Sequence, residues 1–290
     1  MSGPVILALP GNETLAAEIA AEAGAQLGTL ETRRFPDGET YLRLLSDVAG
    51  RDVILVCTLA DPDPLVLRLI FAARTARERG AARIILVAPY LAYMRQDQAF
   101  HAGEAVTSVQ FAALLSAEID RLVTVDPHLH RHKALGEIYG VPAEALHAAP
   151  LLSAWIRTHV AAPLIVGPDS ESEQWASAIA AGAPAVVLRK KRRGDREVEI
   201  AFPDLAPFAG RQPVLVDDIA SSGRTLVMAC QGLQQRGFPQ PICVVVHPLF
   251  AENAFDRLRT VSAQIVSTNT VPHPTNTISV AALLASSLRD

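Results

Sequence analysis

Residues 213–225 hold the side chains best suited to binding a phosphorylated sugar. They read Pro-Val-Leu-Val-Asp-Asp-Ile-Ala-Ser-Ser-Gly-Arg-Thr, so a short apolar strand at 214–216 ends at two carboxylates, Asp217 and Asp218. The small residues that follow predict a tight turn, and Thr225 stands where a helix over 226–236 should begin. A turn of this kind directs backbone N–H groups inward, and a helix N-terminus adds partial positive charge. The stretch therefore predicts a phosphate site beside acceptors for sugar hydroxyls.

This stretch resembles the phosphoribosyl-diphosphate (PRPP) binding motif shared by phosphoribosyltransferases and ribose-phosphate diphosphokinases. The resemblance implies that ribose 5-phosphate is bound by Asp217, Asp218, Ala220, Ser221, Ser222, Gly223, Arg224 and Thr225. Ser221 departs from the Asp or Thr common in the family, and Arg224 from the usual glycine or alanine. The alternative interpretation is an ordinary strand–turn–helix whose acidic pair caps a helix or faces solvent.

A second motif, Phe-Pro-Asp-Gly-Glu at 35–39, has the composition of a turn, and a plain hairpin loop is the alternative. It is similar to the Phe-x-Asp-Gly-Glu loop of ribose-phosphate diphosphokinases, which in that family reaches an adenine site in the neighbouring subunit. The similarity implies that Phe35, Asp37 and Glu39 bind ATP and that the chain forms a homo-oligomer, at least a dimer.

A third motif, Pro-Tyr-Leu-Ala-Tyr-Met-Arg-Gln-Asp, occupies residues 89–97 at the end of an expected strand. Arginine offers a planar fork for phosphate oxygens, and Gln and Asp can bind the edge of an amino-purine. A solvated loop is the alternative. The segment is similar to the family's Pro-Tyr-x-x-Tyr-x-Arg-Gln-Asp, which implies ATP binding by Arg95, Gln96 and Asp97.

Two further strand ends carry candidate metal ligands. Residues 126–128 read Asp-Pro-His where the family has Asp-Leu-His, whose histidine binds the magnesium of MgATP; the matching residue is His128. Residues 167–169 read Gly-Pro-Asp, and the resemblance implies that Asp169 holds magnesium or ribose. Pro127 and Glu171 depart from the family's pattern, and a basic solvated loop is the alternative for the histidine. Mg²⁺ is the expected cofactor.

A basic run, Arg-Lys-Lys-Arg-Arg at 189–193, follows an expected strand over 185–188. Such a run is usually a solvated loop or a nucleic-acid or targeting patch. Here it resembles the Lys-x-Arg loop of ribose-phosphate diphosphokinases, which implies catalytic roles for Lys190 and Arg192. Mobile cations that close over a diphosphoryl group suit phosphoryl transfer.

The elements that position these motifs alternate between apolar strands and helical patterns, which indicates βαβ units and mostly parallel sheets. Residues 140–150 contain two prolines and no clear periodicity, and the linker is expected near 145–150. We predict an α/β protein of two similar three-layer α/β/α, phosphoribosyltransferase-like domains. Residues 1–147 would carry the nucleotide-binding loops without a PRPP loop. Residues 148–290 would carry the ribose 5-phosphate loop and the catalytic flexible loop.

Composition supports two domains, since 290 residues suffice for two cores of ordinary size. The net charge of −4 argues against nucleic acid as a partner. No apolar run is long enough to span a bilayer and no secretory signal is recognisable, so we expect no membrane association. Three cysteines without metal-type spacing indicate buried thiols and a reducing, cytoplasmic compartment.

The resemblance extends over nearly the whole chain and adds Thr-Asn-Thr-Val-Pro at 268–272. It implies transfer of the β,γ-diphosphoryl group of MgATP to the C1 hydroxyl of ribose 5-phosphate, giving PRPP and AMP. A PRPP-dependent phosphoribosyltransferase is one alternative, although it would need only the 213–225 motif. A non-catalytic regulatory homologue is the other, suggested by the departures from the family's pattern.

Overall fold

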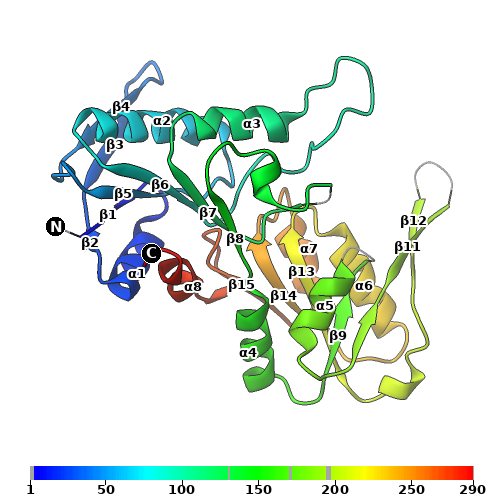
Figure 1. The fold of residues 1–290 in the computed structure, drawn as a ribbon. Helices are drawn as coiled ribbons and strands as arrows, with labels where there is room; N and C mark the ends of the chain where they lie inside the picture. Colours follow the sequence, from blue (N-terminus) through cyan, green and yellow to red (C-terminus); the bar gives the residue numbers. More distant parts are fainter. Residues whose placement is uncertain (1–2, 130, 170–171, 194–196, 290) are drawn as a thin grey trace. The chain divides into compact units, whose positions relative to one another are not determined.

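The chain forms two compact units (Figure 1), and the computed structural model describes residues 3–129, 131–169, 172–193 and 197–289 of it. Unit 1 comprises Met1–Leu146 together with Val280–Asp290, and unit 2 comprises His147–Ser279. The prediction that residues 148–290 form one domain is wrong for the last residues. The terminal helix α8 (Ala281–Ser286) packs against α1 (Glu13–Ala23) instead. An apolar helical pattern shows that a helix is buried, but not in which core.

Unit 1 is built on a six-stranded parallel sheet. Its central strands are buried on both faces, which explains their continuous apolar runs. Helices α2 and α3 cover one face, and α1 and α8 cover the other (Figure 1). In sheet order the strands are β2 (Gln26–Leu27), β1 (Val5–Ala8), β5 (Asp52–Val56), β6 (Arg83–Ala88), β7 (Arg121–Val125) and β8 (Ala143–Leu146). The other helices are α2 (Asp63–Glu78), α3 (Thr107–Ser116) and the 3-10 turn η1 (Leu135–Glu137).

Unit 2 repeats this plan with a second six-stranded parallel sheet. Helices α6 and α7 share one core with the sheet, and α5 packs on β9 and β13. In sheet order the strands are β10 (Ala185–Val187), β9 (Pro163–Gly167), β13 (Gln212–Ala220), β14 (Ile242–Pro248), β15 (Gln264–Thr268) and β16 (Asn276–Ile278). The helices are α4 (Ala149–His159), α5 (Glu173–Ala180), η3 (Ala206–Phe208), α6 (Arg224–Gln234) and α7 (Ala254–Val261).

The two sheets have the same strand order, and each unit inserts a two-stranded hairpin after its second strand. In unit 1 the hairpin consists of β3 (Leu30–Arg34) and β4 (Thr40–Leu44), and in unit 2 of β11 (Arg189–Arg193) and β12 (Glu197–Ala201). The predicted α/β class with two similar, mostly parallel domains is confirmed. The basic run, expected as a loop, is instead a strand, since backbone pairing does not require the apolar alternation that identifies strands in sequence.

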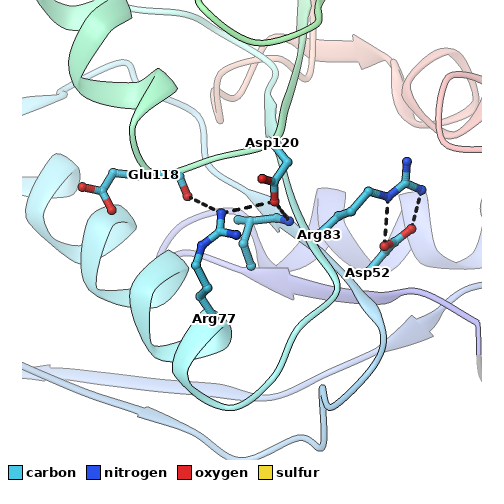
Figure 2. A network of polar contacts seen from close by, with 6 residues as sticks. Asp52, Arg77, Arg83, Glu118 and Asp120 are labelled. Atoms are coloured by element: carbon cyan, nitrogen blue, oxygen red, sulfur yellow. Dashed lines mark hydrogen bonds and ion pairs between the residues drawn. The ribbon is translucent and has the colours of Figure 1, made fainter.

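Ion pairs tie together the amino ends of the strands in unit 1 (Figure 2). Arg83, which begins β6, binds Asp52, which begins β5, through two hydrogen bonds of 3.0 and 2.6 Å. Asp120 precedes β7; its carboxylate accepts a bond of 2.7 Å from the Ile84 N–H and one of 3.2 Å from Arg77 of α2. These contacts therefore hold the amino ends of β5, β6 and β7 together. The loops that carry the candidate motifs leave the opposite, carboxyl edge.

The three cysteines are buried free thiols, as predicted for Cys57 and Cys243. Burial raises the pKa of Cys57 to about 12. The sulfur atoms of Cys230 and Cys243 lie 3.8 Å apart in the core between α6 and β14. Across the described residues, no helix has the length and apolar character needed to cross a membrane.

Candidate active site

The acidic pair of unit 2 lies within β13, not after it. The apolar residues 214–216 are fully buried, but the strand continues to Ala220, so Asp217 and Asp218 are partly buried members of a central strand. Asp217 is paired with Val245 of β14. The Asp218 N–H donates to Asp217 Oδ1 at 3.1 Å, which fixes the first carboxylate against the backbone. Both acids are thus held by a rigid element at the carboxyl edge of the sheet.

A third carboxylate belongs to the same group. Burial, followed by the charges of Asp218 and Asp169, raises the pKa of the Asp217 carboxyl well above its usual range. Asp169 follows β9, the neighbour of β13 in the sheet. Crowded carboxylates favour a proton or a cation between them, so the group suits a metal ion or the donor hydroxyls of a sugar.

The turn that holds Asp169 is closed by Ser172. Its hydroxyl donates to the Asp169 carbonyl at 2.5 Å and accepts from the Asp169 N–H at 3.2 Å. The Ser172 side chain therefore shapes the loop. A Cβ on Gly167 would come within 2.6 Å of the Ser172 hydroxyl, so this packing requires glycine there. Glu171, which departs from the family's pattern, lies outside the described residues.

A tight turn joins β13 to α6, as predicted. Gly223 has φ +65°, a left-handed conformation that glycine adopts without strain, and the helix begins at Arg224, one residue before the predicted start at Thr225. A Cβ on Gly223 would lie 3.3 Å from the Cβ of Ala254, which begins α7. The turn is therefore packed against α7, and its left-handed backbone favours glycine.

The peptide groups of this turn have a common orientation. The Ala220 carbonyl accepts a bond of 2.8 Å from the Phe250 N–H, and the Ser221 carbonyl accepts one of 3.1 Å from the Ala251 N–H. In a trans peptide the N–H points opposite to the carbonyl, and the described chain has no cis bond. The N–H groups of Ser221 and Ser222 therefore face away from the 250–251 segment.

No N–H of residues 221–225 donates a hydrogen bond to any other described part of the chain. The first N–H groups of α6 are unpaired for the usual reason that a helix leaves them without a carbonyl partner. Together with the oriented turn they form a concave set of donors at a helix N-terminus, the arrangement that binds phosphate and other anions.

The hairpin of unit 2 carries the two predicted catalytic residues. Lys190 of β11 is paired with Ile200 of β12, and Arg192 is paired with Val198. The side chains of Lys190 and Arg192 lie outside the described residues. The base of the hairpin is buried, since Ile200 belongs to the core of unit 2 and Phe202 packs against it.

The 35–39 motif forms the turn of the unit 1 hairpin. Phe35, Asp37 and Glu39 are all exposed. The Arg33 guanidinium lies over two aromatic rings, 4.6 Å from the Phe35 centroid and 4.3 Å from that of Tyr41. This stacking gives an exposed loop a defined, aromatic and cationic surface.

The 89–97 motif follows β6, with Tyr93 at φ +61° and its hydroxyl bonded to Asp63. Arg95 and Gln96 are exposed, and Gln96 Oε1 accepts a bond of 3.1 Å from the Thr107 hydroxyl. The side chain of Asp97 is only 3% exposed and pairs with Arg131 at 2.6 Å. Its second oxygen is buried and has no partner in the described chain.

Arg131 is a residue that the sequence did not identify. It is distant from Asp97 along the chain, and the only signal was its place in a basic, histidine-containing loop. The same loop begins with Asp126, which is buried at φ +37°, and contains His128, which is partly buried. His128 belongs to unit 1 and Asp169 to unit 2, so the two predicted metal ligands come from different units.

A metal site made by the protein alone is absent from the described residues, which contain no suitable group of three His, Cys, Asp or Glu side chains. One or two of the carboxylates of Asp217, Asp218 and Asp169 would still suffice for a divalent ion that is completed by other ligands. Mg²⁺ is commonly bound by one or two carboxylates, with waters and substrate phosphates supplying the rest.

Comparison with known proteins agrees with this arrangement. Residues 4–118 match the N-terminal domain of ribose phosphate pyrophosphokinase, and residues 135–275 match the phosphoribosyl transferase domain. The chain is 34% identical to a ribose-phosphate pyrophosphokinase of Methanopyrus kandleri, over 99% of both chains. It is 31% identical to that of Methanothermobacter thermautotrophicus, over 99% of this chain and all of the relative. The crystal structure of phosphoribosylpyrophosphate synthetase from Mycobacterium smegmatis superposes with a TM-score of 0.85 at 25% identity, covering 99% of this chain and 98% of that one.

Proposed function

The chain belongs to the ribose-phosphate pyrophosphokinase family, also called ribose-phosphate diphosphokinases, and we propose that it synthesises PRPP. The reaction transfers the β,γ-diphosphoryl group of ATP to the C1 hydroxyl of ribose 5-phosphate and releases AMP. The observation that carries the proposal is the turn at 220–225, whose unpaired N–H groups adjoin the carboxylates of β13. One short segment thus offers donors for a phosphate and acceptors for ribose hydroxyls.

In the proposed sugar site the 5-phosphate is bound by the backbone N–H groups of residues 221–225. The hydroxyls of Ser221, Ser222 and Thr225 add donors, and Arg224 adds a cation at the first position of the helix. Asp217 and Asp218 accept hydrogen bonds from the ribose hydroxyls. Because these groups sit on a central strand and a helix start, they orient the sugar with little loss of conformational freedom.

The proposed nucleotide site uses unit 1. Phe35, with its stacked arginine, suits a purine ring, and the buried, unpartnered oxygen of Asp97 suits a donor such as a purine amino group. The remaining nucleotide contacts would come from Asp37, Glu39, Arg95, Gln96 and His128. A homo-oligomer, at least a dimer, is part of the proposal. Its support is that the large apolar side chains exposed in the described chain all belong to unit 1: Leu27, Phe35, Leu45, Leu67, Phe71, Phe100, Val109 and Leu114.

Mg²⁺ is the proposed metal; His128 of unit 1 and Asp169 of unit 2 are each proposed as a ligand, with the phosphates of the nucleotide supplying others. When bound, it would neutralise phosphate charge during transfer. The crowded carboxylates around Asp217 support a cation near the sugar. Lys190 and Arg192 would stabilise the charge of the transferred group and of the leaving AMP, which is the main task of a protein in phosphoryl transfer. The buried free thiols support a reducing, cytoplasmic location.

The test measures AMP release from MgATP with and without ribose 5-phosphate, and identifies the sugar product by mass. We expect AMP formation that depends on ribose 5-phosphate and a pentose product carrying one diphosphate and one monophosphate. Lys190→Ala should bind both substrates and lose turnover by about two orders of magnitude or more, as when a group that stabilises transition-state charge is removed. Nucleotide binding without AMP formation in the unmutated protein would contradict the proposal.

A further inference from the structure

A side chain of α7 holds the turn at 220–225 of unit 2 on the side opposite its N–H groups. We infer that this residue, Arg257, is a positioning residue for the phosphate of the sugar. The inference rests on the proposed function for the identity of the ligand. Arg257 Nη2 donates a hydrogen bond of 2.8 Å to the carbonyl of Ser222. This carbonyl belongs to the peptide that ends at the Gly223 N–H.

The bond completes a series of three consecutive anchored peptides. The Ala220 and Ser221 carbonyls are bound by the N–H groups of Phe250 and Ala251, and the Ser222 carbonyl is bound by Arg257. Since each peptide is trans, three successive N–H groups face away from the segment that holds the carbonyls. Without Arg257, the third peptide would have no anchor of this kind and could rotate its N–H away from the ligand.

Arg257 also places a permanent positive charge behind the turn. Its side chain is partly buried, and its Nε atom is inaccessible and has no hydrogen-bond partner among the described residues. A partly buried charge acts more strongly on its neighbours than a fully exposed one. The guanidinium therefore polarises the Ser222 peptide and makes the Gly223 N–H a better donor to an anion.

Helix α7 fixes the arginine relative to the turn. Ala254, three residues earlier on the helix, is the residue against which Gly223 packs, with a distance of 3.3 Å to a Cβ built on the glycine. Positions three apart lie on the same face of a helix. One face of α7 thus contacts the turn through a methyl group and a guanidinium, and the other two anchors are backbone groups. Arg257 is the anchor that a substitution can remove.

The test compares Arg257→Met, Arg257→Lys and a control, Arg259→Met, in the full chain. Arg259 lies on the same helix, is largely exposed and pairs with Asp256, so its loss makes the same charge change away from the turn. Calorimetry would measure the Kd for ribose 5-phosphate and for inorganic phosphate. Steady-state kinetics would give KM for ATP and kcat, and amide NMR would follow the Gly223 N–H during phosphate titration.

We expect Arg257→Met to raise both Kd values about ten- to a hundredfold, the range for losing a hydrogen bond to a charged group. KM for ATP should stay unchanged, and the phosphate-induced shift of the Gly223 amide should decrease. Arg257→Lys should lie between Arg257→Met and the unmutated protein because it keeps the charge, and Arg259→Met should bind like the unmutated protein.

Unchanged Kd values in Arg257→Met would overturn the inference, and so would equal weakening of ATP and ribose 5-phosphate, which indicates general disruption. Failure of the unmutated protein to bind either ribose 5-phosphate or phosphate would also overturn it. Failure to form AMP while phosphate still binds would contradict the proposed function alone, because the binding measurements do not depend on turnover.

Discussion

Asp217 is held by the fold in a place where ionisation is unfavourable. Its pKa is raised by burial and by the charges of Asp218 and Asp169. A carboxyl with a raised pKa in the folded state stabilises the fold only while it is protonated. That stabilisation is complete below the unfolded value of about 3.9 and is lost as the pH rises through the higher folded pKa. At neutral pH, where the unfolded carboxyl is ionised, burial of this side chain therefore destabilises the apo protein.

Asp217→Asn should consequently raise the melting temperature by a few degrees at about pH 8, where the unfolded carboxyl is ionised and the buried position disfavours that charge. The gain should shrink steadily as the pH falls through the folded pKa toward the unfolded value of about 3.9, because below that value the carboxyl is protonated in both states. The same variant should bind ribose 5-phosphate more weakly, since it loses a charged acceptor. Asp256→Asn, at an exposed position of α7, controls for net charge. A melting difference that does not vary with pH would refute the argument.

Gly223 combines a left-handed backbone with a close neighbour, and these two constraints can be separated. Gly223→Ala should destabilise the protein by about 1–2 kcal/mol through its positive φ, plus a packing cost against Ala254. Gly237→Ala is the matched control, since Gly237 has φ +82° but open space around a built Cβ. Urea unfolding should show the larger loss for Gly223→Ala, and calorimetry should show weaker ribose 5-phosphate binding for that variant only. Equal losses of stability would show that Ala254 does not constrain the turn.

The sequence predicted the local structure around the candidate site residues where the signal lay in neighbouring residues. The turn, its glycine and the helix start after Asp217 and Asp218 are all consequences of neighbouring residues, and the structure has them within one residue of the prediction. Arg131 and Arg257 were missed because each acts on a segment distant along the chain, Asp97 and Ser222 respectively. Nothing in a basic loop or a surface helix of one sequence specifies such a contact.

At the level of elements, most strands of both sheets followed from apolar periodicity, but β8, whose end overlaps the expected linker near 145–150, and the basic run at 189–193 did not. Its charged residues gave no apolar alternation, and its strand character comes from pairing with β12. Strand β13 was also predicted too short, because its last residues are polar while their backbone remains in the sheet. Because the residues at the carboxyl edge are polar, hydrophobic periodicity did not reveal the strands that position them.

The base of the unit 2 hairpin packs against α6, where the ring of Phe202 lies over Gly232. A Cβ on Gly232 would lie 2.2 Å from the ring of Phe202, and the Arg236 guanidinium covers that ring at 4.0 Å. Replacing a helical glycine by alanine ordinarily stabilises a protein by about 1 kcal/mol. Here the methyl group would displace the ring, so the sign of the effect should be reversed.

Gly232→Ala should therefore lower the free energy of unfolding in urea. In the Phe202→Ala background, where the ring is absent, the same substitution should be neutral or stabilising. A double-mutant cycle isolates this coupling. Gly136→Ala, at a glycine with open space in unit 1, serves as a control for alanine substitution itself. Additive effects of Gly232→Ala and Phe202→Ala would show that the contact between Gly232 and Phe202 does not hold the hairpin.

On the scale of the whole molecule, the two units share one strand order, yet the chain does not simply run from one to the other. It leaves unit 1 after Leu146 and returns to it at Val280, so unit 2 is an insertion joined by two covalent connections. The returning helix α8 completes the layer beside α1, and Arg289 Nη2 donates to the Glu22 carbonyl at 3.2 Å. The stability of unit 1 therefore depends on the last residues of the chain.

Leu284→Ala tests this dependence, because the side chain of Leu284 on α8 is fully buried. Removing a buried leucine side chain should cost about 2–5 kcal/mol. If the returning helix is part of unit 1, hydrogen exchange should accelerate in α1 and the strands it covers, while α6 and β13 keep their protection. Ser286→Ala, at an exposed position of the same helix, should leave both units unchanged. If exchange instead accelerated in unit 2 while α1 stayed protected, α8 would belong to the core of unit 2. The chain would then divide into two consecutive domains.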